Sequence, residues 1–211
     1  MSAAVLESLL RQGVSNLTLD CCDSKIKQLL LYVQLLEQWN KHFNLTSVRE
    51  PEQMVVRHIL DSMSVVPHIQ EERVLDVGTG AGLPGVVLAI YNPDKNYVLL
   101  DSNGKKTRFL NQVKIELGLS NMAVAKSRAE TYHPDHLFPA VSSRAFASLA
   151  NSVALLDTLL DVNGYFYAMK GKYPEQEIQE LPGRYALEKV HTLVVPGLHE
   201  DRHLIVIKRL A

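Results

Sequence analysis

The sequence predicts an α/β fold in which a mostly parallel sheet of about seven strands follows a helical N-terminal extension. Apolar residues recur at three-and-four spacing before residue 70, which is typical of amphipathic helices. From Arg73 onward, short apolar runs alternate with helical stretches, as in chains built of β and α units. A glycine-rich turn, residues 78–85, separates the first such run from the first helix. We therefore expect residues 1–70 to form an extension packed on an α/β domain of residues 71–211, together making one compact unit.

The extension contains one long amphipathic helix. It is expected over residues 24–43, with Asp23 or Ser24 as its N-cap. Its apolar side chains recur on one face, namely Ile26, Leu29, Leu30, Val33, Leu36 and Phe43. Pro51 favours the first turn of a further helix, which the apolar residues of 54–62 continue.

Seven apolar runs are expected to be strands. They are residues 74–77, 97–100, 122–125, 140–143, 164–169, 187–195 and 204–207, and residues 105–117 read as a helix between the second and the third. Such alternation implies right-handed crossovers between parallel strands. Ligands of these sheets bind beyond the carboxyl ends of the strands, so the residues just after each strand are the candidates for function.

The composition excludes several classes of protein. The chain has 211 residues, 46% hydrophobic and 21% charged, with a formal net charge of -1, which argues against a nonspecific nucleic-acid coat. Its two cysteines, Cys21 and Cys22, are adjacent, and its eight histidines form no metal-ligand pattern, so neither a disulfide framework nor a metal site is expected. The uncharged run 77–93 contains four glycines and two prolines, which no membrane helix carries. Glu7 interrupts the N-terminal segment where a secretory signal needs apolar residues, and we expect a cytoplasmic protein.

The glycine-rich turn is the strongest local signal of a ligand site. Gly80, Gly82 and Gly85 spell GxGxxG, and Asp101 ends the second strand about 20 residues later, as in dinucleotide-binding folds. The same turn also fits other cofactors, and a turn that merely packs strand against helix is the simplest alternative.

Charge favours S-adenosylmethionine over a dinucleotide at this turn. Asp76 stands two residues before Gly78, where its carboxylate would repel a pyrophosphate. S-adenosylmethionine has no phosphate and carries an ammonium and a sulfonium, for which Asp76 is a suitable neighbour. Asp101 can accept the ribose hydroxyls of either cofactor. A methyl donor is thus the expected cofactor, and an NAD-dependent oxidoreductase is the alternative.

Six blocks of the sequence resemble one known family. They are residues 44–46, 58–62, 75–85, 127–130, 143–147 and 169–171, and the resemblance covers about residues 30–208. The chain is similar to the bacterial 16S ribosomal RNA guanine-N7 methyltransferase family, also called glucose-inhibited division protein B. The resemblance implies a Rossmann-like methyltransferase fold with a helical N-terminal extension. It also implies transfer of a methyl group from S-adenosylmethionine to N7 of guanosine 527 in small-subunit RNA.

The resemblance also implies particular cofactor contacts. By position they are Gly78, Leu83, Ala129, Glu130 and Arg144, which join Asp76, Gly80 and Asp101 as the expected cofactor-binding residues. Glu130 has a second interpretation as a carboxylate that stabilises the start of a helix. Arg144 has one as the partner of a surface acid, although its small and apolar neighbours favour a functional role.

The tip of the fourth strand discriminates between methylation chemistries. Ser143-Arg144-Ala145-Phe146 stands where enzymes that methylate amino groups resemble one another in a D/N/S-P-P-Y/F motif. Carbon-5 methylation of pyrimidines needs a cysteine nucleophile, and both cysteines lie before the long helix. Guanine N7 already exposes a lone pair, so transfer requires orientation rather than a general base. No catalytic residue is therefore assigned, and Arg144 is the one candidate.

The expected partner is small-subunit ribosomal RNA, either free or within the assembled subunit. Residues 101–128 carry six cations against two acids, a modest basic segment. The candidate RNA-binding residues are Arg128, Lys170, His42, Asn44 and Arg202. Phe146 could receive the unstacked base or pack in the core, and His58 is expected to be a buried imidazole. No pattern requires a dimer, so a monomer is expected, and a noncatalytic ribosome-assembly factor is a further alternative.

Overall fold

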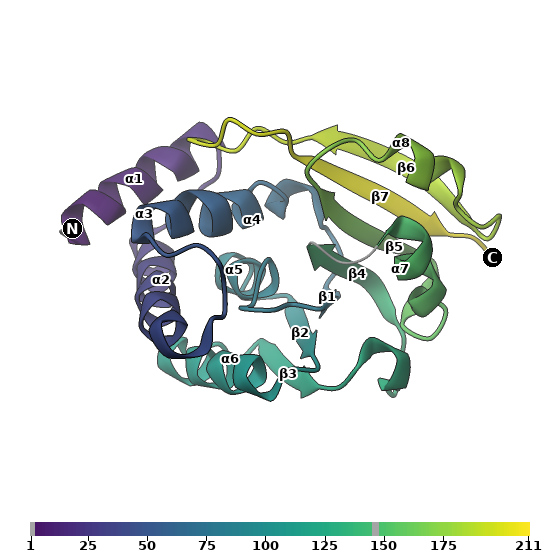
Figure 1. Ribbon diagram of the computed structural model, residues 1–211, viewed down its shortest axis with the longest axis horizontal. Coiled ribbons are helices and arrows are strands. Elements are labelled where there is room, and N and C mark those ends of the chain that lie inside the picture. Colours follow the sequence, from purple (N-terminus) through teal and green to yellow (C-terminus); the bar gives the residue numbers. More distant parts are fainter. Residues whose placement is uncertain (1–2, 145–147) are drawn as a thin grey trace.

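A seven-stranded sheet forms the centre of the molecule (Figure 1). The computed structural model describes residues 3–144 and 148–211. The strand order is β3-β2-β1-β4-β5-β7-β6, in which β1 to β5 run parallel and β7 runs antiparallel to both β5 and β6. The strands are β1 Arg73–Val77, β2 Asn96–Asp101, β3 Met122–Lys126, β4 Phe138–Arg144, β5 Leu160–Lys170, β6 Tyr185–Thr192 and β7 His203–Arg209.

The structure confirms the predicted α/β class and all seven predicted strands. β5 starts at Leu160, four residues before the predicted 164, and β6 starts at Tyr185 and ends at Thr192, whereas the predicted strand covers residues 187–195. Leu193 and Val195 are apolar because they are buried in the core after the strand has ended. Because buried residues outside a strand are also apolar, the apolar pattern did not mark the end of this strand.

Helices surround the sheet and form the N-terminal extension (Figure 1). The extension contains α1 Ala3–Asn16, α2 Asp23–Phe43, α3 Pro51–Met54, a π-helical stretch Val55–Leu60, α4 Asp61–Met63 and a 3-10 turn Val66–His68. The later helices are α5 Gly85–Tyr91, α6 Gly104–Leu117, a 3-10 turn Ala129–Thr131, α7 Leu149–Leu156 and α8 Glu175–Gln179. No helix in the described residues is long and apolar enough to cross a membrane.

The predicted N-cap of the long helix is wrong. Cys22, whose backbone is extended, precedes the first helical residue of α2 and makes no side-chain cap. The Asp23 carboxylate accepts a hydrogen bond from Arg11 Nη2 at 2.8 Å, so it links α2 to α1. Asp23 stays in the first helical turn, where a negative charge is favourable.

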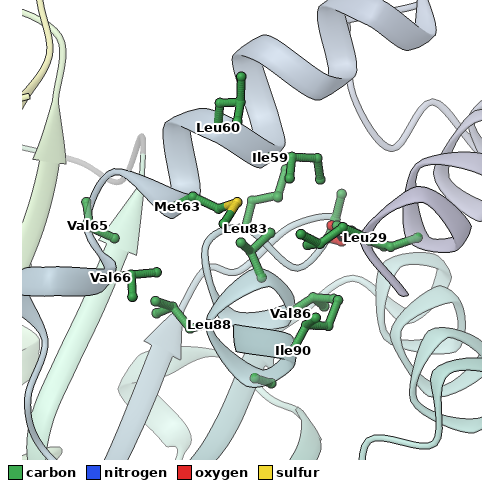
Figure 2. Close-up of a cluster of buried hydrophobic side chains, with 14 of the residues drawn as sticks. Leu29, Ile59, Leu60, Met63, Val65, Val66, Leu83, Val86, Leu88 and Ile90 are labelled. Atoms are coloured by element: carbon green, nitrogen blue, oxygen red, sulfur yellow. Dashed lines mark hydrogen bonds between the residues drawn. The ribbon is translucent and has the colours of Figure 1, made fainter. Parts of the chain in front are cut away.

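One hydrophobic cluster joins the extension to the sheet. Leu29 from α2, Ile59 and Met63 from the helical run 51–63, and Leu83 and Val86 around the start of α5 are buried together (Figure 2). The Tyr32 hydroxyl of α2 adds a hydrogen bond of 2.7 Å to the carbonyl oxygen of Ala81. The extension therefore supports the glycine-rich turn from one side.

Candidate functional site

Two cavities lie side by side along the carboxyl edge of the sheet. The first, here called the glycine-loop cavity, has a volume of about 320 Å³ and lies over the ends of β1, β2 and β3. Its lining is Val77, Gly78, Leu100, Asp101, Ser102, Lys106, Ser127, Arg128, Ala129 and Glu130. The second, the arginine cavity, has a volume of about 510 Å³ and lies over the ends of β4 and β5. Both volumes fall in the range of small-molecule sites.

The glycine loop, residues 78–85, closes over the end of β2. The backbone N–H groups of Gly78 and Thr79 donate to the carbonyl oxygen of Leu100 at 2.9 and 3.1 Å. Gly82 has a φ of 100°, and a Cβ there would lie 2.4 Å from Val86 Cγ2. Only glycine allows both this backbone conformation and the close packing on α5.

Asp76 holds the glycine loop in place from inside the protein. It is fully buried, and its carboxylate accepts hydrogen bonds from Thr79 Oγ1 at 2.6 Å, the Gly85 N–H at 2.9 Å and Ser142 Oγ at 3.2 Å. Burial raises the pKa of Asp76 to about 6, although the three donors act in the opposite direction. Asp76 thus connects β1 to β4 and to the start of α5.

Asp101 is one of two acids that line the glycine-loop cavity, the other being Glu130. The two carboxylate oxygens of Asp101 accept hydrogen bonds from the backbone N–H groups of Gly80 at 2.9 Å and Asn103 at 2.8 Å. Lys106 Nζ lies 3.7 Å from the Gly80-bound oxygen. Each carboxylate oxygen has a second lone pair, so Asp101 can also accept the hydroxyls of a ribose. The cavity therefore has the size and the acceptor that an adenosine group requires.

An arginine network forms one wall of the arginine cavity. Asp61 of α4 is buried and binds two guanidinium groups, with Arg144 Nη1 at 3.1 Å from one oxygen and Arg202 Nε at 3.1 Å from the other. Glu200 pairs with Arg202 at 3.1 Å and with Arg57 at 2.6 Å. The network thus links the helical extension, the tip of β4 and the loop before β7.

The charged groups that line the arginine cavity are mostly cationic. Its lining has four cations, Arg57, Arg144, Lys170 and Arg202, and one acid, Asp61, while Glu177 and Glu200 outside the lining pair with three of the cations. Lys170 Nζ also lies 3.0 Å from a carboxylate oxygen of Glu177 in α8. An excess of arginine and lysine over acids around one cavity is complementary to phosphate.

His58 lines the arginine cavity as a neutral imidazole. Its Nδ1 lies 2.9 Å from the carbonyl oxygen of Arg57, and its Nε2 lies 2.8 Å from the Thr46 hydroxyl. Burial, followed by the nearby charge of Arg144, lowers the pKa of His58 to about 4. The prediction of a buried, hydrogen-bonded imidazole is confirmed.

Comparison with known proteins assigns the family. A family model described as rRNA small subunit methyltransferase G matches residues 25–205. A protein of Marinobacter nauticus named ribosomal RNA small subunit methyltransferase G is 49% identical over 200 residues, which cover 95% of this chain and 94% of that protein. The chain belongs to this family. A Shewanella halifaxensis protein of the same name is 48% identical over 97% of the chain and 100% of its own length.

Solved structures of methyltransferases share the fold. An rRNA methylase from Streptococcus thermophilus has a TM-score of 0.50 and 14% identity, covering 72% of this chain and 95% of its own. A methyltransferase from Thiobacillus denitrificans, solved with S-adenosylhomocysteine, has a TM-score of 0.52 and 12% identity, covering 71% and 90%. Membership of the methyltransferase G family decides against the alternative of an NAD-dependent oxidoreductase.

The glycine-loop cavity brings together most of the residues expected to bind the family's cofactor. Gly78, Asp101, Ala129 and Glu130 all line it, and Gly80 is bonded to Asp101. Glu130 is also the second residue of the 3-10 turn Ala129–Thr131, so both of its interpretations fit this position.

Three expected cofactor residues lie elsewhere. Asp76 is buried behind the loop, and Leu83 is 3% exposed, with its side chain in the cluster of Figure 2. Arg144 lines the arginine cavity and pairs with Asp61. That these three residues contact the cofactor stays a prediction. For Leu83 the contact would be made by its backbone, because its side chain is buried.

The RNA candidates are divided among different places. Lys170 and Arg202 line the arginine cavity, whereas Arg128 lines the glycine-loop cavity. Asn44 ends α2 in the left-handed conformation and accepts a hydrogen bond from Arg49 at 2.8 Å. His42 is exposed at the end of α2, and neither it nor Asn44 lines a cavity. Phe146 lies outside the described residues.

Sequence reasoning missed two charged residues of the site, Asp61 and Arg57. Asp61 lies in the block 58–62 that carried the family resemblance, which was the only available signal for it. Lys106 is one of the six cations of the basic segment 101–128, and its position in the glycine-loop cavity comes from the fold rather than from the sequence. In the described residues no group of three or more His, Cys, Asp or Glu side chains is arranged to hold a metal ion.

Proposed function

We propose that the chain transfers a methyl group from S-adenosylmethionine to N7 of a guanosine in small-subunit ribosomal RNA. The observation that carries this proposal is the pairing of two unlike cavities on one sheet edge. The glycine-loop cavity offers an acid and a backbone turn for an adenosine, and the arginine cavity offers three cations for RNA, namely Arg57, Lys170 and Arg202. The name shared by the relatives supports the same activity.

The residues of the two cavities divide the work. Asp101 would bind the ribose, and Arg144, at the tip of β4, which pairs with β1, would bind the cofactor's carboxylate. When bound, S-adenosylmethionine supplies an electrophilic methyl group. Arg57, Lys170 and Arg202 would hold RNA phosphates so that the guanine lies in line with that methyl.

The reaction requires no general base from the protein. The N7 lone pair forms the new bond to carbon, and the electron pair of the breaking carbon–sulfur bond stays on sulfur. His58, the imidazole in the arginine cavity, has both ring nitrogens engaged and a pKa lowered to about 4, which suits an orienting cavity rather than proton transfer.

Transfer of a labelled methyl group tests the proposal. The protein is incubated with labelled S-adenosylmethionine and either small-subunit RNA or intact subunits, and the digested nucleosides are identified. We expect 7-methylguanosine, and the sequence resemblance implies that it forms at guanosine 527. Label on another nucleoside would refute the proposed chemistry. Binding of S-adenosylhomocysteine without any transfer would favour a noncatalytic assembly factor.

The proposal includes three finer statements. The chain acts as a monomer, it acts in the cytoplasm where its RNA substrate is made, and it acts on RNA that is either free or assembled. Comparing the two substrates in the same labelling experiment separates free RNA from the subunit. Light scattering of the purified protein reads the oligomeric state.

Replacing Lys170 by alanine is expected to weaken RNA binding and its dependence on salt. Removing one phosphate contact lowers the slope of log affinity against log salt by about one. RNA binding measured between low and physiological salt checks this, with Lys27→Ala as the control, since Lys27 is an exposed cation of α2 outside both cavities. An unchanged slope in Lys170→Ala would remove Lys170 from the interface.

A further inference from the structure

An exposed aromatic ring lies at the C-terminal end of α2. Phe43 is the last residue of this helix, and it is 41% exposed. The centroid of the exposed His42 ring lies 6.4 Å from the centroid of the Phe43 ring. Lys105 Nζ lies over the Phe43 ring, 6.0 Å from its centroid. We call these three side chains the Phe43 platform. None of them lines either cavity.

The ring of Phe43 is supported from below. The ring of Trp39, one turn earlier in α2, lies 5.2 Å from Phe43 and 5.6 Å from Phe109 of α6. Phe109 is fully buried, so this row of rings anchors the platform in the core. A supported ring with an exposed surface loses little freedom when a flat ligand stacks on it.

Residues that are close to the platform along the chain line both cavities. Thr46, three residues after Phe43, lines the arginine cavity, and Lys106, next to Lys105, lines the glycine-loop cavity. Lys105 is in the first turn of α6, which begins just beyond the carboxyl end of β2. An RNA strand that entered the arginine cavity would therefore pass near Phe43.

We propose that Phe43 stacks on an unpaired nucleobase that flanks the target guanosine, while Lys105 lies near the phosphate of that nucleotide. Proteins commonly bind single-stranded RNA through an exposed aromatic ring, on which a base stacks, and through neighbouring cations, which attract the backbone. Lys105 and Arg108 supply exposed positive charge at the start of α6, which is complementary to the RNA backbone. The inference rests on the proposed function, because it assigns a second contact for the same substrate.

Trp39 provides a direct test of binding, since it is the only tryptophan in the chain. Short single-stranded RNA is titrated into the protein while the Trp39 emission is followed. We expect the emission to change on binding in the wild type, and the affinity to fall about fivefold or more in Phe43→Leu, which keeps apolar contact with Trp39 but loses the ring. Ile115→Ala, which alters an exposed apolar side chain farther along α6, is the matched control. Equal affinities in all three proteins would overturn the inference.

Methyl transfer gives the second readout. Phe43→Ala is expected to raise the KM for RNA about fivefold to a hundredfold with a smaller effect on kcat, and Phe43→Tyr to restore it, because stacking needs only the ring. An unchanged KM in Phe43→Ala, with a normal thermal melt, would contradict the platform. If the wild type transfers no methyl group, the proposed function fails, and the Trp39 titration still decides whether Phe43 binds single-stranded RNA.

Discussion

Replacing Asp76 by alanine is expected to destabilise the protein and to abolish cofactor binding. The change leaves three buried donors, on Thr79, Gly85 and Ser142, without their acceptor. Each unsatisfied buried donor costs about 1–3 kcal/mol, so a loss of about 3 kcal/mol or more in the free energy of unfolding is expected. Urea unfolding and titration with S-adenosylhomocysteine measure the two effects. A variant with wild-type stability would contradict this role for Asp76.

Asp76→Asn separates the hydrogen bonds of this residue from its charge. An asparagine can still accept from Thr79 and Gly85 and can donate to the Ser142 hydroxyl. We expect this variant to fold and to keep most of its affinity for S-adenosylhomocysteine. A loss of affinity in a folded Asp76→Asn protein would show instead that the negative charge itself attracts the cofactor.

The raised pKa of Asp76 also predicts a pH dependence of stability. Because burial raises this pKa from 3.8 to about 6, the folded state binds the proton more tightly than the unfolded state. Protonation of Asp76 therefore adds about 3 kcal/mol to the free energy of unfolding. This stabilisation is fully present below about pH 4 and is lost as the pH rises through about 6. The free energy of unfolding of the wild type, relative to that of Asp76→Asn, should therefore fall between these pH values. An identical pH dependence of the two proteins would contradict the raised pKa.

Asp61→Ala is expected to reduce methyl transfer to RNA by about a hundredfold. Asp61 acts as a positioning residue, since it fixes Arg144 and Arg202 at 3.1 Å each. Without it, two neighbouring guanidinium groups lose their shared counter-charge, which also costs about 3 kcal/mol of stability. Transfer kinetics and urea unfolding measure the two consequences.

Two variants serve as controls for Asp61. Asp61→Asn keeps a hydrogen-bond acceptor for one arginine and should recover part of the lost rate. Glu7→Ala breaks the exposed pair of Glu7 with Arg11 in α1, which is expected to contribute little. A normal kcat for RNA in folded Asp61→Ala would show that the network is not needed to position the arginines.

The fold could be predicted because its signals are local. Most strands are apolar runs bounded by polar residues or glycines, although β6 mixes apolar and charged residues. The turn after β1 is identified by its glycines. The end of β6 was misplaced because Leu193 is buried by tertiary packing outside the strand. The N-cap of α2 was misplaced because Asp23 binds Arg11 of another helix. Sequence periodicity reports neither of these contacts.

The site was only partly predictable, for the same physical reason. Asp101 and the 129–130 segment follow strands, so the topology alone brings them to one edge. The arginine network joins Asp61 to Arg144 and Arg202, which are 83 and 141 residues away in sequence. Leu83 stands in the glycine loop, yet its side chain faces the helical extension, whose packing no motif specifies.

Binding measurements on two variants test the central claim that the cofactor and the RNA occupy adjoining but different cavities. S-adenosylhomocysteine and small-subunit RNA are each titrated into Asp101→Ala and Lys170→Ala. We predict that Asp101→Ala loses about tenfold or more in affinity for S-adenosylhomocysteine and keeps its RNA binding, and that Lys170→Ala shows the reverse. Loss of S-adenosylhomocysteine binding in Lys170→Ala with normal binding in Asp101→Ala would contradict the assignment of the two cavities.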